Sequence, residues 1–281
     1  MVTIDTFLKT KDYLICVDSD GCAMDTMNIK HIRCFGPCMV DEWGLHDYAD
    51  AILTRWNDIN LFTMTREINR FKGLSLALRE IDGAFTHIDD LQTLVDWVDN
   101  SDELSNDALK RAIDCNPSSI SLKKALSWSE SVNRSIKKLP QEEIKPFDLV
   151  LDALRFAHEK ADIAIVSSAN VEAVNEEWQK HGLLQHVDIV MAQDCGSKAF
   201  CISKLLEKGY NKSNVLMCGD APGDMQAAKL NDVNFYPILV KYEKDSWQEF
   251  VDTALNKLLN NEYAGDYQQK KIDDFHKNLE N

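Results

Sequence analysis

The stretch YLICVDSDGCAMD, residues 13–25, joins a strand pattern to a pair of carboxylates. Its first five residues form an apolar run of the length and type expected for a strand buried on both faces. The run ends at Asp18, and Asp20 follows before Gly21, which permits a sharp turn at small steric cost. Because ligands of open α/β sheets bind at the carboxyl ends of strands, the pattern predicts a site where this strand ends.

The two carboxylates of this stretch have two interpretations. Carboxylates this close repel each other unless a cation or a shared proton relieves them, so Asp18 and Asp20 indicate a metal site or an acid–base site. The same letters are also typical of a solvated turn, because Asp and Gly are among the commonest turn residues. The motif alone leaves both interpretations open.

The composition favours a globular chain that does not bind nucleic acid. The chain has 281 residues, of which 44% are hydrophobic, enough for one large domain or two of ordinary size. Its net charge is −15, from 46 acidic and 31 basic residues, whereas a nucleic-acid-binding surface needs a basic face. An anionic small substrate stays compatible with this charge, because a metal ion and one lysine can reverse the local potential.

The chain is expected to be cytoplasmic and to have no membrane partner. Residues 1–11 lack the apolar core of a signal peptide, and no apolar run approaches membrane-spanning length. The eight cysteines are therefore expected to be free thiols in a reducing compartment, most of them buried. Cys34 and Cys38 have no matching His or Cys pair nearby, which argues against a zinc site.

From residue 146 onward, strand and helix patterns alternate. Pro146 is predicted to be the first residue of a helix that continues over 147–160, and Gly182 is predicted to stop a later helix. Strands are expected at 163–166, 187–191, 214–218 and 234–240, and helices at 171–181, 200–208, 225–230 and, as two segments, within 246–279. Such alternation predicts a parallel sheet with helices on both faces.

The region between residues 26 and 145 has a helical pattern. Amphipathic segments predict helices at 49–57, 65–71, 91–98 and 122–139, with a loop at 101–105. Four tryptophans, Trp43, Trp56, Trp97 and Trp128, fall in this region and are assigned to its core.

Polar residues recur where the predicted strands end. Ser167 follows the second strand, Asp220 and Asp224 follow the fourth in GDAPGD (219–224), and Lys198 opens an intervening helix. Taken singly, these residues have ordinary interpretations as a helix-cap region, a turn and a solvated lysine. Because the carboxyl ends of parallel strands lie on one edge, the four together predict a single cleft shared with Asp18.

These segments resemble the four ordered motifs of the haloacid dehalogenase superfamily, in its β-phosphoglucomutase-like and phosphatase branch. The motif residues are Asp18, Asp20 and Gly21 in the first, Ser167 in the second, Lys198 in the third, and Gly219, Asp220 and Asp224 in the fourth. The resemblance covers about residues 10–25 and 146–240. Cys22 stands where the family usually has threonine.

The resemblance implies two domains. A Rossmann-like catalytic core is expected from residues 1–25 and 146–281, and a mainly helical cap domain that selects the substrate from residues 26–145. Within the cap, RFKGLS (70–75) is similar to the family's substrate-specificity loop. The resemblance therefore implies substrate contacts for Arg70, Lys72 and Gly73.

The resemblance also implies an activity: Mg²⁺-dependent hydrolysis of a small phosphorylated metabolite through an aspartyl-phosphate. Asp18 would attack phosphorus, and Asp20 would protonate the leaving oxygen and then activate water. Ser167 would hydrogen-bond a phosphoryl oxygen, and Lys198 would neutralise charge between Asp18 and the phosphate. The expected Mg²⁺ ligands are Asp18, the backbone carbonyl of Asp20, Asp220, and Asp224 directly or through water.

Other activities stay open at this point. A sugar-phosphate mutase would use the same residues, with a second hydroxyl in place of water as acceptor. A phosphonatase would need a cap lysine able to form a Schiff base, for which Lys30 and Lys72 are the candidates. Dehalogenation of a carbon substrate is disfavoured, because it requires neither a metal nor an acid such as Asp20. A catalytically silent binding protein on the same fold is the alternative from another class. No particular oligomeric state is predicted.

Overall fold

The computed structural model describes residues 2–280, and the chain divides into two compact units. Unit 1 is formed by residues 1–27 and 141–281, and unit 2 by residues 28–140. The role of unit 2 as a substrate-selecting cap stays a prediction. Across residues 2–280, no helix combines the length and the apolar character needed to cross a membrane.

Unit 1 is built on a five-stranded sheet, as the alternating pattern predicted. All four strand pairs are parallel, and the strand order is β3-β2-β1-β4-β5, so β1 lies at the centre. Val17 at the end of β1 is in register with Ile165 of β2 and Cys218 of β4. The strands are β1 (Tyr13–Val17), β2 (Ala161–Val166), β3 (Ile189–Met191), β4 (Val215–Gly219) and β5 (Asn234–Pro237).

The three central strands are buried on both faces. Every residue of β2 and β4 is buried, as are the last four residues of β1. Burying an Ile, Leu or Val side chain contributes about 1.5–3 kcal/mol. This burial explains why the strands read as continuous apolar runs rather than as alternating ones.

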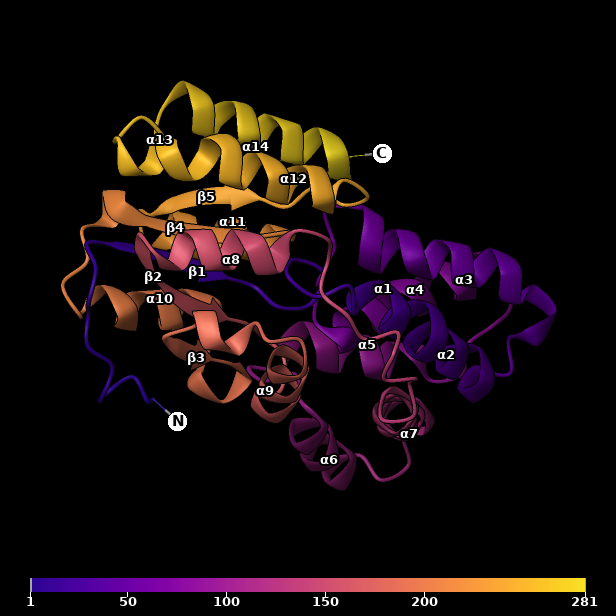
Figure 1. Cartoon of the computed structure of the whole chain (residues 1–281). Coiled ribbons are helices and arrows are strands. Elements are labelled where there is room, and N and C mark those ends of the chain that lie inside the picture. Colours follow the sequence, from indigo (N-terminus) through magenta and orange to yellow (C-terminus); the bar gives the residue numbers. More distant parts are fainter. Residues whose placement is uncertain (1, 281) are drawn as a thin grey trace. The chain divides into compact units, whose positions relative to one another are not determined.

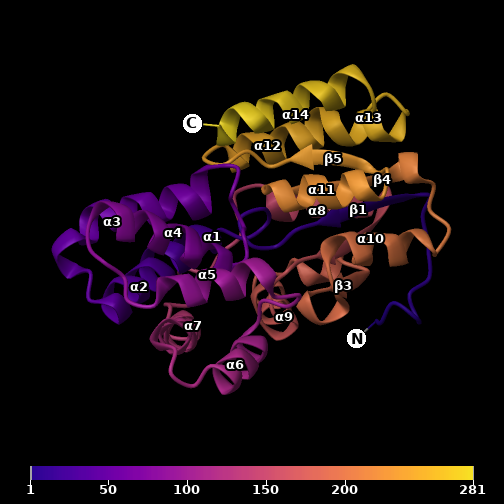
Figure 2. The same cartoon turned by 180° about the vertical axis from the view of Figure 1, so that it is seen from behind.

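Helices cover both faces of the sheet. Figure 1 shows α8 in front of the strands, and Figure 2, from behind, shows α10 and α11 on the opposite face. The α/β fold class, with helices on both sides of a parallel sheet, is thus confirmed. The helices of unit 1 are α8 (Val150–His158), α9 (Val171–Lys180), α10 (Lys198–Leu206), α11 (Pro222–Leu230), α12 (Glu243–Glu249), α13 (Leu255–Leu259) and α14 (Asp266–Leu279), and a π-helical turn at Phe250–Ala254 joins α12 to α13.

Local sequence signals set the ends of the helices that follow strands. The Asn170 side chain accepts hydrogen bonds from the first turn of α9, and the Ser197 hydroxyl accepts one from Phe200 N in α10. Gly182, at φ +69°, follows the end of α9 as predicted. Pro222 is the first residue of α11, where the missing N–H removes no helical bond.

The prediction that Pro146 begins a helix is wrong. Pro146 instead forms an antiparallel bridge with Met24, and Phe147 N donates to the carbonyl of Ala23 at 3.0 Å. The chain then passes through Leu149 at φ +73° before α8 begins at Val150. Pairing with a segment more than a hundred residues earlier therefore overrides the local helix signal.

The last strand is shorter than predicted. β5 ends at Pro237, and Ile238 N then donates one more backbone bond to the Gly219 carbonyl of β4 at 2.8 Å. Beyond it, Val240 N donates to the Asn278 side chain of α14 rather than to a strand.

Unit 2 contains only helical elements. Its helices are α1 (Met27–Lys30), α2 (Gly36–Trp43), α3 (Ala49–Asn57), α4 (Arg70–Ala84), α5 (Leu91–Asn100), α6 (Asn106–Cys115) and α7 (Ile120–Ile136), with π-helical turns at His31–Phe35 and Asp58–Phe62. The predicted helix at 65–71 is wrong, because Thr65 to Glu67 form turns and Asn69 caps α4, which begins at Arg70.

An aromatic cluster forms the core of unit 2. Trp56 and Trp128 are fully buried and meet edge to face, with ring centroids 6.0 Å apart. Phe35 and Phe71 pack against Trp128 in the same way. Trp43 and Trp97 are only half-buried, so the predicted core of four tryptophans is correct for two of them.

Candidate active site

The strand order brings the predicted site residues to one edge of the sheet. Asp18 follows β1, Ser167 follows β2 and Asp220 follows β4, and these three strands are adjacent and parallel. Asp18 is fully buried, while Ser167 and Asp220 are 3% and 1% exposed. The three residues therefore lie at the carboxyl edge, as the sequence pattern predicted.

Lys198 connects two of the predicted carboxylates. Its Nζ lies 3.0 Å from Asp18 Oδ1 and 2.7 Å from Asp224 Oδ1. Lys198 is the first residue of α10 and is itself only 7% exposed. A buried charge needs a partner, so this lysine is held at the site by the two carboxylates rather than solvated at the surface.

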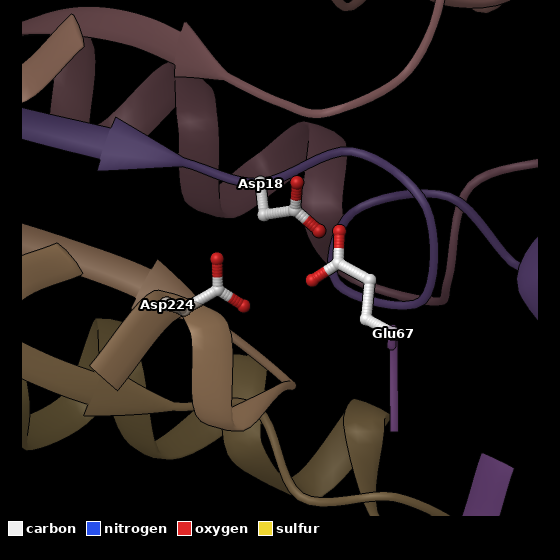
Figure 3. Close-up of side chains that lie close together, drawn as sticks. All are labelled: Asp18, Glu67 and Asp224. Carbon is white, nitrogen blue, oxygen red and sulfur yellow. The ribbon is translucent and has the colours of Figure 1, made fainter. Parts of the chain in front are cut away.

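Asp18 and Asp224 come close together from separate elements. Figure 3 shows the Asp18 side chain just past the end of β1 and the Asp224 side chain in the first turn of α11. Carboxylate oxygens of the two lie within 4.8 Å of each other. Asp224 is also fixed through its Oδ2, which accepts a hydrogen bond from Ala221 N at 3.1 Å.

The glycine that ends β4 makes room for Asp224. A Cβ atom at Gly219 would collide with the Cβ and the carboxylate of Asp224. The first glycine of GDAPGD is thus required by close packing against the last aspartate.

Asp20 has a different environment from Asp18. It is half-buried, and Thr26 Oγ1 donates to its Oδ1 at 2.5 Å. Gly21 turns the chain at φ +88°, and its N–H donates to the Met24 carbonyl at 2.8 Å. Sequence reasoning missed Thr26, because a threonine six residues after an aspartate carries no local signal of contact.

The donor set of the site fits a hard cation. Asp18, Asp220 and Asp224 are all buried, whereas Lys198 is the one buried amine placed among them within the described chain. Three carboxylates gathered in a low-dielectric region provide hard oxygen ligands, which are the ligands that a divalent cation such as Mg²⁺ prefers.

The pKa of Cys22 is affected by the same buried carboxylates. Burial first, and then the carboxylates of Asp220, Asp18 and Asp224, raise the pKa of its thiol well above the ordinary value. Its Sγ lies 3.5 Å from the carbonyl of Cys218 in β4. The thiol thus stays neutral and contacts a backbone carbonyl as a weak donor.

Ser167 is positioned by the neighbouring strand. Its N–H donates to the Met191 carbonyl at 3.0 Å, and its hydroxyl oxygen accepts from Ala169 N at 3.2 Å. Ser167 does not cap α9, which Asn170 does, so the cap-region interpretation of this serine is not what the structure shows.

The three residues predicted in the specificity segment differ from one another. Gly73 is buried, and a Cβ there would lie 2.5 Å from Asn60 Oδ1, so Gly73 serves the packing of unit 2. Lys72 is exposed in the first turn of α4.

Arg70, the first residue of α4, is held by neutral groups. Its Nη1 donates to Ser129 Oγ at 3.1 Å and to Asn133 Oδ1 at 2.8 Å, and its guanidinium lies 5.1 Å from the Phe35 ring centroid. Burial lowers the pKa of Arg70, and no carboxylate within residues 2–280 pairs with it. The structure thus gives the three residues different surroundings, and their contact with substrate stays a prediction.

Sequence comparison identifies one protein family. The family profile described as "Haloacid dehalogenase-like hydrolase" matches residues 92–238, just over half of the chain. The matched region includes Ser167, Lys198, Asp220 and Asp224, and begins after Asp18 and Asp20. No curated protein matches the sequence.

Structure comparison finds the same fold in solved structures. A proposed phosphoglycolate phosphatase from Lactobacillus delbrueckii subsp. bulgaricus is 14% identical, with a TM-score of 0.53 over 81% of this chain and 86% of that one. A proposed β-phosphoglucomutase from Thermotoga maritima is 15% identical, with a TM-score of 0.48 over 88% and 97%. A haloacid dehalogenase-like hydrolase from Streptococcus pneumoniae is 14% identical, with a TM-score of 0.46 over 94% and 98%.

Proposed function

Since the chain belongs to the haloacid dehalogenase-like hydrolases, we propose that it is a Mg²⁺-dependent phosphohydrolase acting on a small phosphorylated metabolite through an aspartyl-phosphate. One observation carries the proposal: Lys198, buried at the carboxyl edge, binds both Asp18 and Asp224. A lysine so placed can offset the charge that develops when a phosphate dianion approaches a carboxylate.

In the first half-reaction, the Asp18 carboxylate attacks phosphorus. A bond forms from its oxygen to phosphorus while the bond to the leaving oxygen breaks, which gives the aspartyl-phosphate. Asp20 donates its proton to the leaving oxygen, so the product departs as an alcohol. Lys198, 3.0 Å from Asp18 Oδ1, holds the nucleophile in orientation throughout.

In the second half-reaction, Asp20 returns to the protonated state. It takes a proton from water as that water attacks phosphorus, and the acyl-phosphate bond breaks to release inorganic phosphate and the Asp18 carboxylate. The Thr26 hydroxyl donates to Asp20 Oδ1 and so orients the carboxylate that accepts this proton. Ser167 would hydrogen-bond a non-bridging phosphoryl oxygen.

A divalent cation would be held by Asp18, Asp220 and the backbone carbonyl of Asp20, with Asp224 contributing directly or through water. It would supply charge neutralisation for the transferring phosphoryl group. The burial of three carboxylates at one edge of the sheet supports this assignment, because a divalent cation of this kind prefers carboxylate oxygens as ligands.

The proposal is tested by screening phosphorylated metabolites for phosphate release with and without Mg²⁺, using the wild type and Asp18→Asn. We expect release only with the wild type and Mg²⁺, and a fall of at least about 10⁴-fold in kcat for Asp18→Asn, because removal of a nucleophile is rarely mild. Activity that is insensitive to EDTA would contradict the metal assignment. Isomerisation of a sugar phosphate without phosphate release would identify a mutase instead.

A further inference from the structure

Two buried tryptophans donate hydrogen bonds to the loop that carries Asp18 and Asp20. Trp178 Nε1 lies 2.9 Å from Ser19 Oγ, and Trp247 Nε1 lies 3.0 Å from the carbonyl oxygen of Cys22. Both indoles and both acceptor residues are fully buried. An indole N–H can only donate, and a buried donor needs an acceptor, so each bond fixes one ring to one point of the loop.

The two anchors come from different parts of unit 1. Trp178 lies on α9, which follows β2, and Trp247 lies on α12, which follows β5. In the sheet, β2 lies on one side of β1, and β4 and β5 lie on the other. The loop after β1 is thus held by elements that belong to opposite sides of its own strand.

The acceptor residues occupy the positions that determine the course of the loop. Ser19 stands between the two aspartates, and its carbonyl accepts from Ala23 N at 3.0 Å and Met24 N at 2.8 Å, where the chain folds back. Cys22 follows Gly21, the residue at positive φ. Movement at Ser19 would shift both carboxylates, whereas movement at Cys22 would shift the turn that follows Asp20.

The loop needs such anchors because it holds like charges together. Asp18 and Asp20 are two residues apart, and repulsion between them favours a more open loop. We propose that Trp178 and Trp247 are positioning residues, which act through Ser19 and the Cys22 carbonyl to keep the nucleophile and the general acid in place. This inference rests on the proposed phosphohydrolase function.

The test replaces each indole by a ring that cannot donate, in Trp178→Phe and Trp247→Phe. The probes are p-nitrophenyl phosphate, whose leaving group needs little protonation, and β-glycerophosphate, whose alkoxide needs a general acid. We expect kcat to fall about 10-fold or more while KM changes by less than about 3-fold, since small displacements of reacting groups reduce rate strongly. For Trp247→Phe the loss should be larger with β-glycerophosphate, because this change disturbs the turn after Asp20.

Tyr263→Phe is the matched control in the same unit. Tyr263 is 1% exposed, and its hydroxyl donates to the Phe235 carbonyl of β5 at 2.7 Å, away from the loop. Like Trp247→Phe, this variant loses one buried donor to a backbone carbonyl, but it leaves no cavity, so it should lower the melting temperature less and leave kcat within about 2-fold. The positioning role would be overturned if, in all three variants, the fall in kcat were proportional to the fall in melting temperature and were equal for the two substrates.

Hydrogen exchange gives a readout that does not depend on activity. Backbone amides of residues 18–25 should exchange faster in both tryptophan variants than in the wild type, and at the wild-type rate in Tyr263→Phe. A wild type that hydrolyses no phosphate ester would refute the proposed function while leaving this comparison interpretable. Unchanged exchange of the loop in both tryptophan variants would refute the anchors themselves.

Discussion

Among single residues, Gly219 shows how closely the site is packed. It ends β4, and the Asp224 side chain occupies the space that a Cβ there would fill. Asp224 in turn binds Lys198 at a distance of 2.7 Å, and Lys198 also binds Asp18. A glycine that makes no chemical contribution thus sets the position of three charged groups.

Gly219→Ala should therefore impair catalysis although it changes no polar group. The added methyl displaces Asp224, Lys198 loses a partner, and we expect kcat/KM to fall about 100-fold, with a higher Mg²⁺ concentration needed for half-maximal activity. Steady-state kinetics over a Mg²⁺ titration measure both effects.

Gly223→Ala is the control within the same motif. A Cβ at Gly223 would meet nothing within 4 Å, and the residue is exposed in the first turn of α11. This variant should be as active as the wild type. If Gly219→Ala and Gly223→Ala lowered kcat/KM equally, the packing of Asp224 against Gly219 would not be the cause of the loss.

At the level of elements, unit 2 contains a helix capped by a distant carboxylate. Asp90, just before α5, accepts hydrogen bonds from Ser119 Oγ and from the backbone N–H groups of Ile120 and Ser121 at the start of α7. Burial acts to raise the pKa of Asp90, but the hydrogen bonds from Ser119, Thr93 and Ser121 together outweigh it and lower the pKa to about 2. Asp90 thus links α5 to α7 through its ionised form.

Asp90→Asn should make unit 2 less stable in a pH-dependent way. The unfolded-state pKa of Asp is about 3.9. Because the folded-state pKa is lower, the ionised carboxylate contributes its full stabilisation above the unfolded-state pKa, and the contribution is lost as the pH falls from there through about 2. We expect a loss of about 1 kcal/mol at neutral pH, typical of a lost helix cap, which shrinks in acid.

Thermal melts of both proteins between neutral pH and about pH 2 measure this difference. Asp89→Asn removes a neighbouring exposed carboxylate that makes no hydrogen bond to α7, and it should leave the melting temperature nearly unchanged. If the difference in melting temperature between Asp90→Asn and the wild type stayed constant down to pH 2, the ionised form of Asp90 would not be what stabilises unit 2.

For the whole molecule, the two units are expected to divide the work. Under the proposed function, the groups of unit 1 would handle a phosphoryl unit without distinguishing one ester from another, so we propose that unit 2 selects the substrate. There, Arg70 offers a half-buried guanidinium without a carboxylate partner within residues 2–280, in a chain of net charge −15. Such a group is suited to an anionic part of the substrate.

Arg70→Met should therefore raise KM for the true substrate about 10-fold or more and leave hydrolysis of p-nitrophenyl phosphate nearly unchanged. Lys72→Ala should have a smaller effect, because Lys72 is exposed. Arg134→Met on α7, whose guanidinium donates to Ser131 Oγ at 2.8 Å, is the control for loss of an arginine. If Arg70→Met impaired hydrolysis of the true substrate and of p-nitrophenyl phosphate to the same extent, Arg70 would not determine substrate specificity.

The placement of the site could be predicted, but its contacts could not. Asp18, Ser167 and Asp220 each follow an apolar run, and the rule that parallel strands end at one edge was sufficient to bring them together. The bond from Lys198 to Asp224 joins residues 26 positions apart, and the bond from Trp178 to Ser19 joins residues 159 apart. No periodic pattern encodes such pairs, because each depends on the packing of separate elements.

The sequence by itself determined the alternation of strands and helices, the all-helical character of residues 28–140, and the residues that stand at strand ends. Those features depend on local apolar periodicity and on the chirality and parallel pairing of successive β-α units. The tertiary structure alone decided that Pro146 pairs with Met24 instead of starting a helix, and that Asp224 fits against Gly219. The first outcome depends on backbone pairing between residues 122 positions apart, and the second on side-chain packing where β4 meets α11, and each overrides the weak local preferences.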